Sequence, residues 1–121
     1  MCIRDRIRAS DGAWLAVSDR RLKRNIEELN DDVIHKVMAL KPSSYEYVNS
    51  KNRIRNIGLI AQELQKNFPE FVESSEENMA VDYAGLSVVA LKAIQEQQVM
   101  IEELRKEIRI LREQLDTDNK S

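Results

Sequence analysis

The sequence has few of the residues that build disulfide scaffolds, metal sites and large aromatic cores. Its 121 residues include one cysteine, Cys2, which excludes an intrachain disulfide. The single histidine, His35, has no cluster of ligand residues around it, so we expect a surface helix position, no metal and no cofactor. Aromatic residues make up 5% of the chain and charged residues 33%, which leaves little material for a large core. This balance favours a helical oligomer whose core is completed by partner subunits.

Long apolar runs and an excess of positive charge are also absent. No apolar stretch is long enough to span a bilayer and no signal-peptide pattern is present, so we expect no membrane partner. The formal net charge is −2, which gives no electrostatic reason to expect nucleic-acid binding. The basic run at 20–24 is short, and acidic residues follow it at 27, 28, 31 and 32.

The first residues of the chain stand apart from the rest. Residues 1–6, MCIRDR, resemble the translated end of a transposon adapter used in sequencing libraries. We interpret them as a sequencing artefact, in which case Cys2 carries no meaning and the natural protein extends upstream. In residues 7–17, the turn signal Asp11 and Gly12 precedes an apolar run, which predicts a short strand that ends at Ser18.

A helix is predicted in the segment that follows the basic run. Asn30 is the candidate N-cap, and Asp31 and Asp32 place negative charge in the first turn, where the helix dipole favours it. This helix should stop by Lys41, because Pro42 disfavours helical backbone at the residue before it.

Short strands and one short helix are predicted after that proline. Residues 44–48 and 55–60 have the pattern of two strands that can pair across a polar loop. A short helix at 61–67 has apolar residues at intervals of four. Two extended pieces, 71–72 and 79–81, then flank an acidic loop.

The last predicted element is a long helix, which Asp82 can cap and which runs from about 83 to 115. A heptad pattern begins in it, with Ile94, Ile101, Ile108 and Leu115 at position a and with Gln97, Leu104 and Leu111 at position d. Isoleucine at a with leucine at d favours parallel dimers in model coiled coils, and only about three heptads are present. The plain alternative is an amphipathic helix that folds onto its own domain.

Ser18 and Lys23 are the candidate catalytic residues. A serine hydroxyl is a poor nucleophile until a base takes its proton, and a neutral lysine amine can be that base. The usual lysine pKa of ~10.4 must then fall toward ~7–8, by burial or by nearby positive charge such as that of Arg20, Arg21 and Arg24. The plain alternative is a capping serine followed by a solvated basic face.

The spacing of these two residues restricts how they can meet. Five residues correspond to a rotation of about 140° along a helix, and an odd spacing places side chains on opposite faces of a strand. Either the backbone turns sharply between Ser18 and Lys23, or the lysine acts on a serine of a neighbouring subunit. We therefore expect that three copies must assemble before the hydroxyl and the amine can meet.

Four sequence blocks carry a family resemblance: SDRRLKRNI (18–26), IGLIAQEL (57–64), FPEFV (68–72) and VDY (81–83). In this order they resemble the C-terminal intramolecular chaperone domain of phage tail spikes, tail fibres and endosialidases, the S74 peptidase family. The resemblance implies a homotrimer that helps an upstream fibre or spike segment of the same chain to fold and then cuts itself off at the serine.

The resemblance also implies roles for individual residues. Ser18 matches the nucleophile of the family and Lys23 matches its general base, so the chain would be a self-cleaving serine endopeptidase. The scissile bond should flank Ser18, and we favour Val17–Ser18 over Ser18–Asp19. Asn25 is a candidate oxyanion donor by proximity alone.

The residue patterns and the resemblance together predict an α+β fold, mainly helical, with small β elements and a long C-terminal helix that forms a trimeric coiled coil. We expect an upstream fibre end at 7–17, a chaperone domain at 18–92, and a coiled coil with a frayed tail at 93–121. The implied place of action is the host cytoplasm during virion assembly, and the released domain should be absent from the mature tail. Two alternatives stay open: a trimerisation and chaperone module that does not cut, and an unrelated coiled-coil adaptor.

Overall fold

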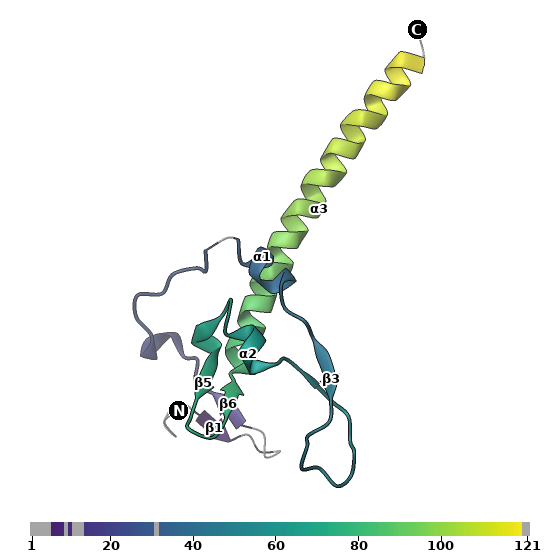
Figure 1. Ribbon diagram of the computed structural model, residues 1–121. Coiled ribbons are helices and arrows are strands. Elements are labelled where there is room, and N and C mark those ends of the chain that lie inside the picture. Colours follow the sequence, from purple (N-terminus) through teal and green to yellow (C-terminus); the bar gives the residue numbers. More distant parts are fainter. Residues whose placement is uncertain (1–5, 9, 11–13, 31, 120–121) are drawn as a thin grey trace.

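A small head and one long helix make up the chain in the computed structural model, which describes residues 6–8, 10, 14–30 and 32–119 (Figure 1). Of the segment interpreted as an artefact, residues 1–5 lie outside this description. The helix is α3 (Tyr83–Asn119). The head contains α1 (Val33–Met38), α2 (Ala61–Leu64), η2 (Arg20–Leu22), η3 (Pro69–Phe71), β1 (Arg6–Arg8), β2 (Trp14–Ala16), β3 (Ser43–Tyr45), β4 (Asn56–Gly58), β5 (Val72–Ser74) and β6 (Met79–Val81). The predicted α+β, mainly helical fold with a long C-terminal helix is confirmed.

Each strand of the head belongs to a two-stranded antiparallel sheet. β3 pairs with β4, as the sequence predicts, and the strands are shorter than predicted because each pairs over three residues. The two predicted extended pieces around the acidic loop form the hairpin of β5 and β6. Before Ser18 the sequence predicts one strand, and the structure has two, since β1 pairs with β2; the second ends at Ala16, short of the predicted end at Ser18.

The core lies where the first turns of α3 meet α2 and the residues after it. Leu64 and Phe68 are almost completely buried, and they contact Leu86 and Val89 of α3. Leu86, Val89 and Ala93 follow one another at intervals of three and four, so they share one face of the helix. Residues 86–96 of α3 therefore fold onto their own domain. The alternative to a coiled coil, an amphipathic helix packed on its own domain, describes this part of α3 and not its whole length.

Beyond Glu96, no described side chain of α3 is buried. All side chains from 97 to 119 are exposed, and Figure 1 shows this half of the helix projecting away from the head. The predicted a and d positions keep large apolar side chains in water there: Ile101 is 37% exposed, Leu104 58%, Ile108 48% and Leu111 58%. An amphipathic helix of this kind gains most of its stability from packing its apolar face, so this seam is suited to a partner helix.

The predicted start of α1 is wrong. The helix begins at Val33, and its N-cap is Asp32, which has φ 87° and caps nothing with its own side chain. The Glu96 carboxylate of α3 caps the helix instead: it accepts the backbone N–H groups of Asp32 at 2.5 Å, Val33 at 3.2 Å and Ile34 at 2.9 Å. Among the described residues, Glu96 is the one charged side chain that is buried. A carboxylate 64 residues away in sequence does the work that local capping residues were predicted to do.

A Glu96→Ala chain is expected to be less stable than the wild type by about 2–4 kcal/mol, because the N–H groups at the start of α1 lose a charged acceptor. Denaturant unfolding at a fixed protomer concentration, followed by circular dichroism, measures this loss. The matched control is Glu103→Ala, an exposed position further along α3, which should change stability by less than ~0.5 kcal/mol. Equal losses in the two variants would show that Glu96 does not hold α1.

Within the described residues, none of the helices combines the length and the apolar character that crossing a bilayer requires.

Candidate functional site

Ser18 and Lys23 lie on the two sides of a single tight turn. Between them, η2 forms from two short-range backbone bonds: Leu22 N–H donates to the Asp19 carbonyl at 3.0 Å and Lys23 N–H to the Arg20 carbonyl at 3.1 Å. The backbone is extended at both ends of this turn, with ψ 127° at Asp19 and ψ 148° at Lys23. The chain therefore changes direction within three residues, as a 3-10 turn permits.

This turn brings the two candidate groups into contact within one chain. The Lys23 Nζ atom lies 2.6 Å from Ser18 Oγ, a hydrogen-bond distance. Of the two routes that the spacing leaves open, the structure therefore takes the sharp turn. The expectation that three copies must assemble before the hydroxyl and the amine can meet is wrong. The two residues are joined by a tight 3-10 turn, and not by a regular helix or strand.

The turn is fixed by Asp19. Its carboxylate accepts the backbone N–H of Arg21 at 2.9 Å, and the Arg21 guanidinium binds the same carboxylate with a shortest distance of 2.7 Å. The hydrogen bonds from the Arg21 side chain, and then from its backbone, lower the pKa of Asp19 below its ordinary 3.8. Because the pKa of Asp19 is lower in the folded chain than in the unfolded chain, these hydrogen bonds add to the stability of the fold at any pH above the ordinary pKa. This added stability is lost as acid protonates the Asp19 carboxylate. The turn should thus be held throughout the neutral range.

Water surrounds the Ser18–Lys23 pair. Both side chains are exposed, as are all side chains from 20 to 30, whereas Val17 is half-buried. Asn25, the proximity candidate for an oxyanion donor, has φ 54°, a left-handed conformation that asparagine tolerates, and it continues the bend of the chain. Burial favours the neutral form of an amine over its charged form. The single chain therefore supplies the contact between hydroxyl and amine, and in it the amine is exposed to water.

Metal ligands are not grouped in the described part of the chain. Within it, no three or more histidine, cysteine, aspartate or glutamate side chains are placed to hold a metal ion. His35 lies on α1, where it contacts Asp32 at 3.2 Å with both side chains exposed. The chemistry available at the turn is that of the hydroxyl and the amine.

Comparison with known proteins places this turn at the start of a family domain. The model of the family Peptidase S74, described as chaperone of endosialidase, matches residues 18–73. The match begins at Ser18 itself and includes Lys23.

Two curated relatives come from phages. The long tail fiber protein Gp37 of Enterobacteria phage M1 and that of Enterobacteria phage Ox2 are each 38% identical to this chain over 96 residues. The aligned region covers 73% of this chain and 38% of each relative, so the chain spans well under half the length of these relatives. With the four sequence blocks, the head and the long helix, these matches identify residues 18–73 as a domain of the S74 family, the chaperones of endosialidase.

Proposed function

We propose that this chain is a homotrimeric intramolecular chaperone that helps an upstream tail-fibre or spike segment of the same polypeptide to fold and then releases itself by cutting the Val17–Ser18 bond. The observation that carries the proposal is the 2.6 Å contact between Lys23 Nζ and Ser18 Oγ in a turn that opens the family domain. That contact favours a self-cleaving chaperone over a module that does not cut, since a purely structural turn does not need a lysine amine on its serine.

The proposed reaction is hydrolysis of one peptide bond. The Ser18 hydroxyl oxygen attacks the carbonyl carbon of Val17 while the Lys23 amine takes the hydroxyl proton. The Val17–Ser18 C–N bond breaks, and the leaving Ser18 amine takes the proton from Lys23. One water molecule then hydrolyses the ester, which leaves a carboxylate on Val17, an amine on Ser18 and the hydroxyl restored. The Ser18–Asp19 bond is the second candidate.

The proposed domains follow from where the cut lies. Residues 7–17 would stay with the fibre, 18–92 would form the released chaperone domain, and 93–121 would join three chains through a coiled coil. Removing the domain after folding would leave the fibre without the device that aligned its chains, so unfolding becomes hard to reverse and the fibre is kinetically stable. The reaction would take place in the host cytoplasm during virion assembly, and the released domain would be absent from the mature tail.

Intact-mass measurement of the purified 121-residue chain tests the proposal, because this chain contains both sides of the proposed cut. We expect a product that begins at Ser18 to accumulate with time, and we expect a Ser18→Ala chain to keep its full length. Sedimentation of the Ser18→Ala chain should show a trimer, whereas an unrelated coiled-coil adaptor predicts a dimer. A trimer that never shortens would support the chaperone that does not cut, and cleavage that survives Ser18→Ala would remove Ser18 as nucleophile.

A further inference from the structure

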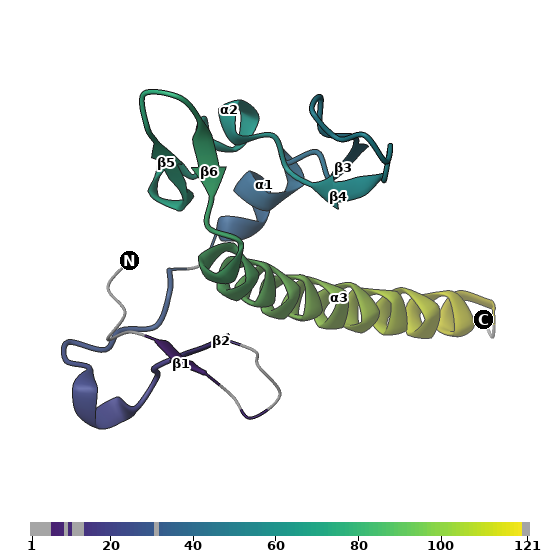
Figure 2. The ribbon, with the colours of Figure 1, turned by 90° about the horizontal axis from the view of Figure 1, so that it is seen from below.

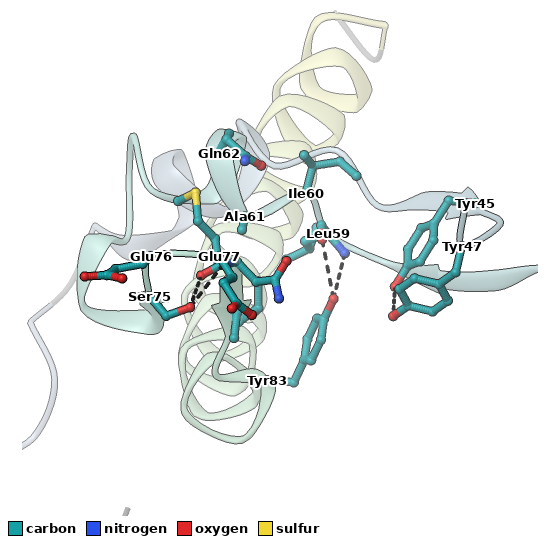
Figure 3. A pocket seen from close by; sticks show the side chains of 14 residues that line it. Tyr45, Tyr47, Leu59, Ile60, Ala61, Gln62, Ser75, Glu76, Glu77 and Tyr83 are labelled. Atoms are coloured by element: carbon teal, nitrogen blue, oxygen red, sulfur yellow. Dashed lines mark hydrogen bonds between the residues drawn. The ribbon is translucent and has the colours of Figure 1, made fainter. Parts of the chain in front are cut away.

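A cavity of about 660 Å³ lies between the β3–β4 hairpin and the loop that joins β5 to β6 (Figure 3). Tyrosine side chains line one side of it, and the loop residues 75–78 line the other. Between them, Ile60 and Met79 add apolar surface. The tyrosines are Tyr45, Tyr47 and Tyr83. A concave site with aromatic and apolar walls and a few polar groups is typical of a binding pocket.

The tyrosine wall is held by hydrogen bonds. The Tyr83 hydroxyl oxygen accepts the backbone N–H of Leu59 at 3.0 Å, which ties the start of α3 to the end of β4. The rings of Tyr45 and Tyr47 meet edge to face at 5.3 Å between centroids, and their hydroxyl groups lie 3.4 Å apart. The hydrogen bond with Tyr47 is the main cause that raises the pKa of Tyr45 to about 12. The Tyr45 hydroxyl is therefore neutral at physiological pH, and the wall presents aromatic faces to the cavity.

The loop wall carries negative charge. Ser75 and Asn78 close the loop through a backbone bond of 2.8 Å and two bonds of the Ser75 hydroxyl, at 3.0 and 3.1 Å. This closure places Glu76 and Glu77 at the loop tip, where both are exposed. Arginine guanidinium groups pair with carboxylates and stack on aromatic faces. The cavity is thus suited to an apolar side chain that is flanked by arginines.

A segment with this chemistry lies in the same chain, at η2. Leu22 is 75% exposed, although burial in an apolar environment would stabilise a side chain of this size. Arg20 and Arg24 stand two residues before and two residues after it, and both are exposed. Arg21 is already paired with Asp19. Lys23 contacts Ser18. Apart from these two residues, the segment 20–24 offers one apolar side chain flanked by two arginines.

The segment and the cavity face different sides of the molecule. In both ribbon views, η2 lies on one side of the first turns of α3 and the β3–β4 hairpin lies on the other (Figures 1 and 2). Two complementary surfaces on different sides of one chain form head-to-tail contacts between copies, and such contacts close into a ring when the rotation allows it. This arrangement indicates that the segment bound in a cavity comes from a neighbouring copy and not from the same chain.

We propose that the cavity of one copy receives residues 20–24 of the next copy in the trimer, with Leu22 against the apolar wall and its two flanking arginines toward the glutamates of the loop. The inference rests on the proposed homotrimer and adds a contact between the heads of neighbouring copies. Lys23 lies within the docked segment and contacts Ser18, so docking would place this pair against the neighbouring copy and take it out of water. The contact would thereby couple assembly to cleavage.

Disulfide trapping tests the docking without any need for cleavage. All chains carry Cys2→Ser, which removes the native thiol, and Ser18→Ala, which removes the proposed nucleophile. The test chain adds Leu22→Cys in the segment and Met79→Cys in the cavity. We expect mild oxidation to link most chains of the trimer covalently on a non-reducing gel. The matched control combines Leu22→Cys with Met38→Cys, a 73% exposed position on α1 outside the cavity, and it should give at least ~10-fold less linked product if the pairing is specific.

The outcomes separate this inference from the proposed function. A trimer without intersubunit links, or with the two cysteines linked inside one chain, would overturn the docking. If the cysteine chains form intersubunit links efficiently but the wild-type chain is never cleaved, self-cleavage would be overturned and the docking would stand.

Charge reversal tests whether docking controls cleavage. Chains that carry Glu76→Lys with Glu77→Lys should remain trimeric through α3 and should cleave at least ~10-fold more slowly than the wild type. The matched control is Glu70→Lys, an exposed acidic position outside the cavity, which should leave the rate unchanged. Chains that carry Arg20→Glu with Arg24→Glu should also be slow.

Mixed trimers then show which copy owns the segment. We call the chain with Glu76→Lys and Glu77→Lys cavity-reversed, and the chain with Arg20→Glu and Arg24→Glu segment-reversed. Within either kind of chain, the segment and the cavity carry the same sign of charge. In a mixture, the wild-type segment of the cavity-reversed chain can enter the wild-type cavity of the segment-reversed chain. The acidic segment of the segment-reversed chain likewise meets the lysines of the cavity-reversed chain, so each segment finds a cavity of opposite charge only on the other kind of chain. We therefore expect cleavage in the mixture to recover. A mixture that is as slow as its components, or a cavity reversal without effect, would contradict docking between copies.

Discussion

A Lys23→Ala chain is expected to stay at full length under conditions in which the wild type shortens, with a rate lower by about 10³-fold or more. The reason is the position of Nζ, which lies 2.6 Å from Ser18 Oγ and is the amine placed to take the hydroxyl proton. Intact mass as a function of time measures the rate. Lys66→Ala, an exposed lysine in the residues after α2, is the matched control and should leave the rate unchanged.

Lys23→Arg separates a base from a simple positive charge. The guanidinium of arginine keeps a positive charge and comparable reach, but it stays protonated at any pH that the protein tolerates. We therefore expect Lys23→Arg to be as inactive as Lys23→Ala. Cleavage of Lys23→Arg at the wild-type rate would mean that the lysine acts only as a charge, and the proposed general base would have to be abandoned.

The second large effect is expected in the projecting half of α3. A chain with Ile101→Asp and Leu104→Asp should lose the trimer, with an assembly constant weaker by more than ~100-fold, because each apolar side chain buried in a seam contributes about 1.5–3 kcal/mol and a buried carboxylate opposes packing. These two side chains are 37% and 58% exposed in the single chain, so no contact within the head is lost. Sedimentation over a range of concentrations measures the change.

Ile110→Asp controls for the effect of charge on helix propensity. Ile110 is 46% exposed on the same helix but lies outside the predicted a and d positions. We expect Ile110→Asp to remain trimeric and the seam variant to keep its head folded, since its core residues Leu64, Phe68 and Leu86 are untouched. If Ile110→Asp dissociated and the seam variant did not, the heptad would face solvent and another surface would hold the copies together.

Patterns of local sequence predict most of the fold. The β3–β4 pair, the helix after Gly58 and the long helix are encoded by alternation, by prolines and by apolar spacing within a few residues, and the structure has all three. The start of α1 could not be read in this way, because its cap is Glu96, which is distant in sequence. A signal was present: a glutamate follows Leu86, Val89 and Ala93 on their own helix face, where a charged side chain needs a partner.

The contact between Ser18 and Lys23 could not be predicted from their spacing along a regular helix or strand. In a regular helix or strand, residues 18 and 23 point apart, and a sharp turn between them is one of the two routes by which they can meet. The sequence SDRRLK carries a signal for that turn, since Asp19 accepts the N–H of Arg21 as an N-cap and so starts η2. The contact between Lys23 and Ser18 is thus local, and in the single chain it is exposed to water.

The central claim is that the serine and the lysine meet in each chain but act only when the copies assemble. The most direct test is to measure the cleavage rate of the 121-residue chain over a range of protomer concentrations that spans dissociation, with the trimer fraction measured on the Ser18→Ala chain. We predict that the rate per chain follows the trimer fraction and approaches zero for the monomer. A monomer that cleaves at the full rate of the trimer would contradict the claim.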